Sequence, residues 1–134
     1  MSTSKSFLTE SDLKLLEDQG DVVIYKPKQT IVHQQSPCTK LYWIKTGVIQ
    51  IDFDRLYGSD VLGYLSDGDM FGEVSFMDHA DTSASASAVK DAEVLEVPRE
   101  VLESLLDQDA KLAARFYRTV AMTLAKRIRS TIRK

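Results

Sequence analysis

Residues 67–77 read DGDMFGEVSFM and hold the most informative pattern in the chain. An acidic glycine turn leads into an apolar pair, which Gly72 and Glu73 follow before a short apolar segment begins. A glycine lets the backbone approach a ligand closely, and the N–H groups of a helix's first turn point at a negative group. The carboxylate of Glu73 can accept hydrogen bonds from sugar hydroxyls. The pattern predicts an anion cradle of five consecutive residues: Phe71, Gly72, Glu73, Val74 and Ser75.

Short apolar runs separated by turn residues lie on both sides of that stretch. The clearest is residues 48–53, in which Ile49, Ile51 and Phe53 share one face and polar residues share the other. The predicted strands are residues 22–25, 30–33, 41–44, 48–53, 60–65, 83–88 and 92–97. Strands at spacings of about ten residues are typical of a small β barrel or sandwich.

Helical patterns stand at both ends of the chain. Thr9 is a good helix cap with an acid three residues later, and Gly20 is a natural stop for the helix it begins. Pro98 suits the first turn of a second helix. Asp107 or Asp109 can cap a third helix, which begins near residue 110 and runs to the end of the chain.

The 134 residues predict a single domain with an N-terminal helix in 1–20, a β roll in 21–97 and C-terminal helices in 98–134. No apolar run approaches the roughly 20 residues of a membrane span, and the N-terminus has no apolar signal core. We therefore expect a cytoplasmic chain that makes no use of a membrane. Its single cysteine rules out an internal disulfide and a cysteine-built metal site.

Charge is divided unequally along the chain. All 20 acidic residues lie at or before Asp109, whereas the last twenty residues contain seven Lys and Arg and no acid. Such a basic end indicates either phosphate attraction or a solvated helix face. The two histidines, His33 and His79, lie in separate segments, and no nucleophile elbow, metal cluster or P-loop accompanies them. We expect no enzyme and no metal site.

Taken together, these features resemble the cyclic nucleotide-binding domain, the sensor half of the catabolite activator protein family. The resemblance is carried by residues 25–31 (YKPKQTI), 41–51 (LYWIKTGVIQI) and 68–73 (GDMFGE), in the family's order. It implies an α+β fold, a jelly-roll-like β barrel with an N-terminal helix and two C-terminal helices. It also places the family's phosphate cassette at residues 68–88.

The resemblance implies a ligand site that lacks one member. In the family an Arg pairs with the cyclic phosphate, and Thr82 stands in that place here. Ser83 matches the hydroxyl position that follows it. Residues 82–88 then form either a plain strand or a hydroxyl-lined pocket in which Ser83 and Ser85 replace the Arg. Thr131 falls where the final helix of the family meets the base, although a solvated Thr is the other reading.

The implied function is that of a stand-alone regulatory module. It would bind cyclic AMP, cyclic GMP or a cyclic dinucleotide weakly or atypically and signal through its C-terminal helices. The alternatives are a ligand-independent protein-interaction module with a vestigial pocket and a transcription regulator without its DNA-binding half. An apolar stripe on the last helix either completes the core or also forms the seam of a homodimer: Phe116, Val120, Leu124 and Ile128. No recognition helix follows, so we expect no sequence-specific DNA binding, and any protein partner is unidentified.

Overall fold

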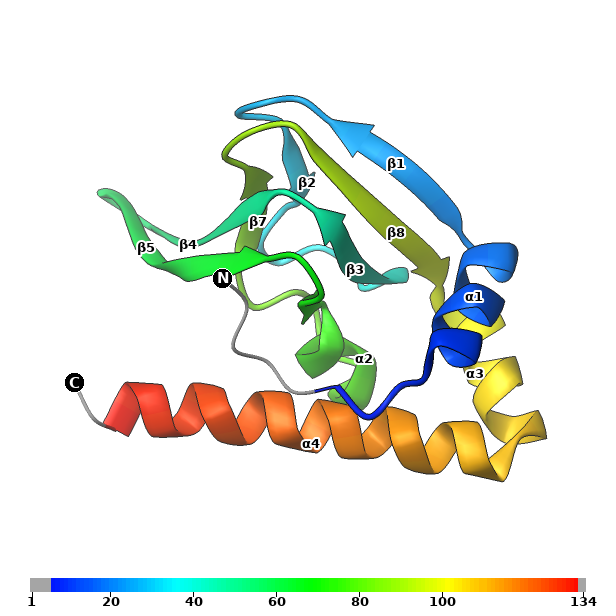
Figure 1. Ribbon diagram of the computed structural model, residues 1–134. Helices are drawn as coiled ribbons and strands as arrows, with labels where there is room; N and C mark the ends of the chain where they lie inside the picture. The colour runs from blue at the N-terminus through cyan, green and yellow to red at the C-terminus, as the bar shows by residue number, and fades with distance from the viewer. Residues whose placement is uncertain (1–5, 133–134) are drawn as a thin grey trace.

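Within residues 6–132, eight antiparallel strands form two four-stranded sheets that close into a roll, and four helices pack against it (Figure 1). The computed structural model describes residues 6–132, with side chains to residue 130. The strands are β1 (Asp21–Tyr25), β2 (Thr30–Val32), β3 (Lys40–Thr46), β4 (Val48–Arg55), β5 (Gly58–Ser66), β6 (Met70–Phe71), β7 (Ser85–Ala88) and β8 (Ala92–Pro98). The helices are α1 (Glu10–Gln19), α2 (Glu73–Asp78), α3 (Arg99–Gln108) and α4 (Ala110–Ile132). The predicted fold class is confirmed.

The first sheet has the order β1-β8-β3-β6 and is covered on both faces. On β3, Leu41 and Trp43 pack with the helices, whereas Ile44 points into the roll. The neighbouring strand β8 divides in the same way, because Leu95 joins the helix-side core and Val94 the roll interior. A sheet buried on both faces uses near-continuous apolar strands, which explains why these two runs were easy to recognise as strands.

The second sheet has the order β2-β7-β4-β5, and its β4–β5 hairpin extends past the roll (Figure 1). Apolar alternation on β4 therefore does not mean equal burial along the strand. Ile49 is fully buried, whereas Phe53 near the outer end is 36% exposed. At the tip, Tyr57 is 91% exposed.

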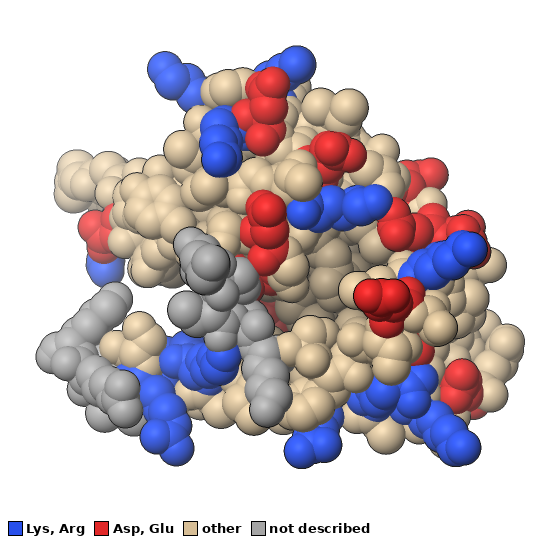
Figure 2. All heavy atoms as spheres, viewed as in Figure 1, with Lys and Arg blue, Asp and Glu red and all other residues tan. Residues whose placement is uncertain are grey.

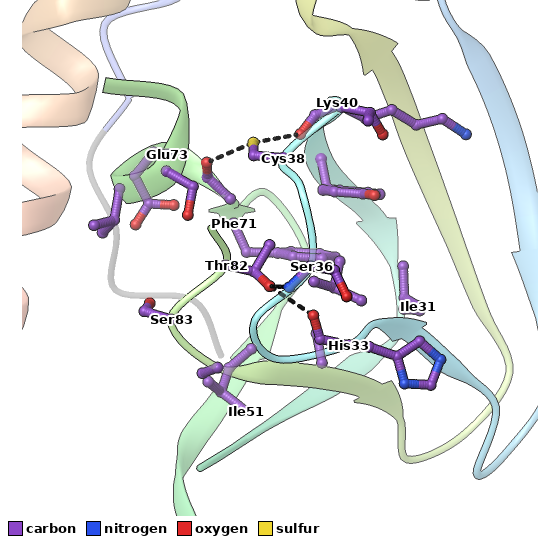
Figure 3. Close-up of a pocket in the computed structure, with 18 of the residues that line it drawn as sticks. Ile31, His33, Ser36, Cys38, Lys40, Ile51, Phe71, Glu73, Thr82 and Ser83 are labelled. Atoms are coloured by element: carbon purple, nitrogen blue, oxygen red, sulfur yellow. Dashed lines mark hydrogen bonds between the residues drawn. The ribbon is translucent and has the colours of Figure 1, made fainter. Parts of the chain in front are cut away.

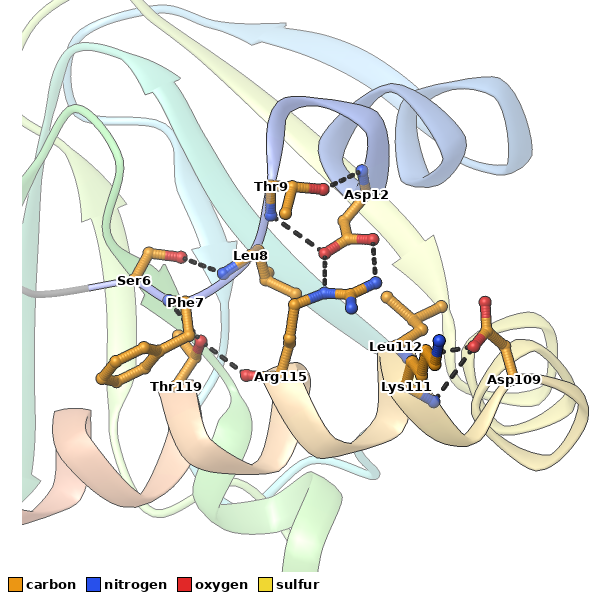
Figure 4. Close-up of polar contacts among 10 residues, drawn as sticks. All are labelled: Ser6, Phe7, Leu8, Thr9, Asp12, Asp109, Lys111, Leu112, Arg115 and Thr119. Atoms are coloured by element: carbon orange, nitrogen blue, oxygen red, sulfur yellow. Dashed lines mark hydrogen bonds and ion pairs between the residues drawn. The ribbon is translucent and has the colours of Figure 1, made fainter.

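The N-terminal segment is fastened to α4 (Figure 4). Thr9 and Asp12 form a capping box at the start of α1, as the sequence predicts. Asp12 also accepts two hydrogen bonds from Arg115 of α4, at 2.7 and 2.8 Å. These bonds hold the pKa of Asp12 below its ordinary value. The Phe7 amide donates to the Thr119 hydroxyl at 2.9 Å, so the chain before α1 lies along the same helix.

The long helix α4 has 23 residues and runs beneath the roll (Figure 1). The carboxylate of Asp109 accepts hydrogen bonds from the amides of Lys111 and Leu112, which decides between the two predicted caps. Lys and Arg side chains follow α4 along the lower edge of the molecule, and most Asp and Glu in that view lie over the roll (Figure 2). None of the helices in residues 6–132 combines the length and apolarity needed to cross a membrane.

Gly47, between β3 and β4, has a φ of 122° that side-chain-bearing residues rarely adopt. A Cβ there would lie 2.6 Å from the Cβ of Ala92. We expect Gly47→Ala to lower the free energy of unfolding by at least about 2 kcal/mol, because strain and overlap add. Gly58→Ala is the matched control, since φ is 93° there but nothing lies within 4 Å. Urea denaturation that found equal losses would contradict this view of the turn.

Candidate functional site

A cavity of about 300 Å³ opens beside α2, between the segment that precedes β3 and the segment that precedes β7 (Figure 3). Its size is at the lower end of the range for small-molecule sites. Apolar side chains make most of one wall: Ile31, Val32, Ile51, Leu65, Phe71 and Ala86. The polar lining includes Glu73, Ser75, Thr82, Ser83 and Arg127. The cavity therefore has an apolar side and a side rich in polar groups.

The residues of the predicted cradle lie where β6 turns into α2. Gly72 has a φ of 90°, and a Cβ added there would lie 3.4 Å from the Tyr42 ring. Glycine is needed because this left-handed turn is also closely packed. The Phe71 ring stacks on Tyr42 with centroids 4.7 Å apart and is itself buried. The turn thus brings the side chain of Glu73 to the edge of the cavity.

Glu73 is fully buried at the first position of α2. Its Oε1 accepts a hydrogen bond from Arg127 of α4. Its Oε2 is also buried and accepts no hydrogen bond from the described residues. Burial raises the pKa of Glu73 above its ordinary value, although the Arg127 guanidinium opposes this shift. A buried carboxylate oxygen without a donor is costly, so the site favours a ligand that brings an N–H or O–H group.

Two arginines connect α2 to the C-terminal helices. Arg127 joins the first residue of α2 to α4 and also donates to the Met70 carbonyl at 3.1 Å. Arg99, at the start of α3, donates to the carbonyls of Ser75 and Phe76 at 2.8 and 3.0 Å. Helix α2 is therefore bound to α4 through its own first residue, Glu73, and to α3 through the carbonyls of Ser75 and Phe76.

Sequence reasoning missed both of these contacts. It counted Arg127 only among the seven Lys and Arg of the last twenty residues and gave Arg99 no role. The only available hint was spacing, since Arg127 lies three residues after Leu124 and so shares a helix face with it. Nothing in the sequence around Arg99 indicated that its guanidinium would reach the carbonyls of α2.

Thr82, the residue that the sequence predicts in the place of an Arg, forms hydrogen bonds with the neighbouring loop. Its hydroxyl donates to the His33 carbonyl at 2.6 Å and accepts from the Ser36 amide at 2.9 Å. The backbone of Thr82 adds two more bonds to the same loop, through the Gln35 amide and the Ser36 carbonyl. Thr82 thus closes one side of the cavity by fastening residues 33–36 to the segment before β7.

The other predicted ligand residues are placed unequally. Ser83 and Val74 are exposed and line the cavity, which the buried Ser75 also lines. Ser85 lies outside the cavity, and its hydroxyl accepts a hydrogen bond from the Gln34 amide at 3.0 Å. Thr131 belongs to the backbone of α4, but its side chain lies outside the described residues.

The four residues of the predicted dimer seam do not share one environment. Phe116 and Val120 are buried in the chain's own core, at 1% and 2% exposure. Leu124 packs against that core and remains partly accessible, and Ile128 is 59% exposed. The sequence allowed either a core role or a dimer role for these residues. Phe116 and Val120 belong to the core of their own chain.

The part of the chain that the structure describes shows no metal site. There, no three His, Cys, Asp or Glu side chains gather as a metal site. His33 lines the cavity, whereas the His79 ring lies 3.4 Å from Arg99 at the end of α2. The site combines a single buried carboxylate, a paired guanidinium and an apolar wall, which is an arrangement for binding.

Comparison with known proteins agrees with this geometry. Residues 22–109 match the sequence profile of the cyclic nucleotide-binding domain. The chain is 32% identical over 107 residues to the cyclic AMP receptor protein of Thermus thermophilus, covering 79% of this chain and 48% of that protein. It is 30% identical over 115 residues to the cAMP-activated global transcriptional regulator Vfr of Pseudomonas aeruginosa, covering 82% of this chain and 52% of Vfr.

A solved structure of a related protein has a similar fold. The crystal structure of the Thermus thermophilus catabolite activator protein superposes with a TM-score of 0.77 at 30% identity, covering 92% of this chain and 57% of that one. The chain spans about half the length of the Thermus thermophilus cyclic AMP receptor protein and of Vfr. The matched profile covers well over half of the chain and includes the cassette, so this chain belongs to the cyclic nucleotide-binding domain family.

Proposed function

We propose that this chain is a regulatory module that binds a nucleotide-type small molecule in the cavity behind Gly72 and reports occupancy through α3 and α4. The observation that carries the proposal is the buried Oε2 of Glu73, which accepts no hydrogen bond from the described residues and belongs to a side chain lining the cavity. A ligand hydroxyl supplies the donor that this oxygen lacks, and a charge-assisted hydrogen bond of this kind is among the stronger ones.

The proposed signal travels through the two arginines. A ligand that engages Glu73 changes the electrostatic partner of Arg127, which belongs to α4. A shift of α2 also reaches α3, because Arg99 holds the carbonyls of Ser75 and Phe76. If the ligand binds one arrangement of the helices more tightly than another, it shifts the population toward that arrangement. The stability of α4 against local opening then changes when the ligand binds.

Titration calorimetry tests this function with the full chain and four probes: adenosine, guanosine, cyclic AMP and cyclic GMP. We expect at least one probe to bind and to change amide hydrogen exchange in α4. Glu73→Gln should weaken that binding by about tenfold or more, because the acceptor loses its charge. Glu93→Gln, at an exposed carboxylate on β8, is the matched control. Absence of heat with all four probes would overturn the proposal.

One observation favours a second function, a protein-interaction module that uses no ligand. The Thr82 hydroxyl is bound to the chain's own backbone, as expected if this side of the cavity serves the fold. In that case neither nucleosides nor nucleotides bind, and Glu73→Gln changes stability alone. The same titrations therefore separate the two functions.

We also propose that the module forms a homodimer through the outer face of α4. Ile128, which the sequence named, belongs to an exposed stripe at alternating spacings of three and four residues. Such spacing suits a two-helix seam. The other members, exposed or partly so, are Ala114, Tyr117, Ala121 and Leu124. Sedimentation equilibrium of wild type and Ile128→Glu tests it, and a wild-type chain that stays monomeric throughout would contradict it.

A further inference from the structure

The charges that line the cavity are already balanced within the protein. Arg127 and Lys40 are the two Lys or Arg residues in the lining that the structure describes. Arg127 pairs with Glu73, and its second terminal nitrogen donates to the Met70 carbonyl. Lys40 places its Nζ 2.7 Å from Oε1 of the buried Glu96. Each cation therefore has a carboxylate partner before any ligand arrives.

The segment that would face a phosphate carries no Lys or Arg. Residues 74–89 contain Asp78 and Asp81 but no Lys and no Arg. The one hydroxyl proton of Thr82 is given to the His33 carbonyl, so that side chain has no donor left for a ligand. Ser83 remains at the cavity edge as a neutral hydroxyl. A ligand anion placed there would gain neutral donors and no opposite charge.

The remaining features of the cavity suit an uncharged molecule with a ring and hydroxyl groups. Glu73 Oε2 needs a hydrogen-bond donor, which a sugar hydroxyl provides. The apolar wall, with Ile31, Ile51 and Phe71, offers a surface for a planar base. A volume of about 300 Å³ fits one nucleoside rather than two.

We propose that the cavity binds an uncharged nucleoside more tightly than the corresponding 3′,5′-cyclic phosphate. The two cations of the described lining are paired with carboxylates of the protein, and the Thr82 hydroxyl donates its hydrogen bond to the His33 carbonyl. This preference rests on the proposed function, since it concerns the ligand of the same site. The phosphate is disfavoured because burying a charge without an opposite charge is costly. A nucleoside forgoes only hydrogen bonds to neutral donors and avoids this cost.

The test compares each nucleoside with its own cyclic phosphate in calorimetric titrations of the full chain. We expect adenosine or guanosine to bind at least about tenfold tighter than its cyclic phosphate, with an affinity that changes little with ionic strength. Equal or tighter binding of the cyclic phosphate would overturn this inference and leave the proposed function standing. Binding of none of the four would overturn both.

Ser83 allows a cation to be added without removing the Thr82 hydrogen bonds. We expect Ser83→Arg to shift the affinity ratio by about tenfold toward the cyclic phosphate, since it restores an opposite charge. Ser83→Gln supplies a long polar side chain without charge and is the matched control. Equal shifts of the ratio in both variants would contradict the inference, because side-chain size rather than charge would then set the preference.

Discussion

Replacement of Arg127 with Met is expected to lower the free energy of unfolding by about 2 kcal/mol near pH 8 and by much less near pH 5. Removing one partner of a fully buried ion pair costs about 3–5 kcal/mol. Arg127 is 39% exposed, so water screens the pair and the smaller value applies. Denaturant titrations across this pH range measure the effect.

The pH dependence has a definite sign. Without Arg127, the pKa of Glu73 rises further above its unfolded value, because burial is then unopposed. A carboxyl with a raised folded pKa binds its proton more tightly when folded, so stability is lost as pH rises through that pKa. As pH falls toward the unfolded pKa of about 4.3, Glu73 takes up its proton first in the folded variant, and the deficit shrinks.

Glu73→Gln provides the control for this experiment. Because it removes the titrating group, the loss caused by Arg127→Met should be the same at the two pH values when it is measured in the Glu73→Gln background. A pH-independent loss in Arg127→Met alone would contradict the pairing of α2 with α4.

Replacement of Phe116 with Ala is expected to cost about 3–5 kcal/mol of unfolding free energy. The ring is 1% exposed and lies at the centre of the helix-side core. It contacts Phe76 of α2 with centroids 5.7 Å apart and Trp43 of β3 at 6.4 Å. The substitution leaves a cavity between the roll and α4, which the neighbouring elements fill only in part.

The adjacent residue gives a matched control on the same helix. Tyr117 is 44% exposed in the single chain, so at protein concentrations too low for the proposed dimer Tyr117→Ala should cost less than about 1 kcal/mol. Urea denaturation of both variants tests the difference. Similar losses at the two positions would mean that α4 does not pack on the roll through its Phe116 face.

Much of the fold was predictable because its local patterns agree with its global arrangement. The capping box at Thr9 and the stop at Gly20 bound α1 in the sequence as in the structure. β6 was missed because two residues, Met70 and Phe71, are too few to show a period. The sequence placed Phe53 on the apolar face of its strand but did not predict that it is 36% exposed. Alternation shows which face a residue lies on, but it does not show how far a hairpin extends from the roll.

The site was harder to predict because its decisive contacts join distant parts of the chain. Gly72 and Glu73 stood out locally, yet the partner of Glu73 lies 54 residues later. The sequence predicts that Thr82 stands in the place of an Arg, and this correspondence stays a prediction. It did not show that the Thr82 hydroxyl is bound to the loop at His33 and Ser36, because hydrogen bonds to backbone leave no pattern in side-chain spacing.

A crystal structure of the chain grown with adenosine tests the central claim most directly. The account predicts a nucleoside in the cavity, with a ribose hydroxyl about 2.7 Å from Oε2 of Glu73 and the base against the wall that holds Phe71. It would be contradicted by a cavity filled with the protein's own side chains, or by a nucleoside bound elsewhere while that carboxylate oxygen finds its donor within the protein.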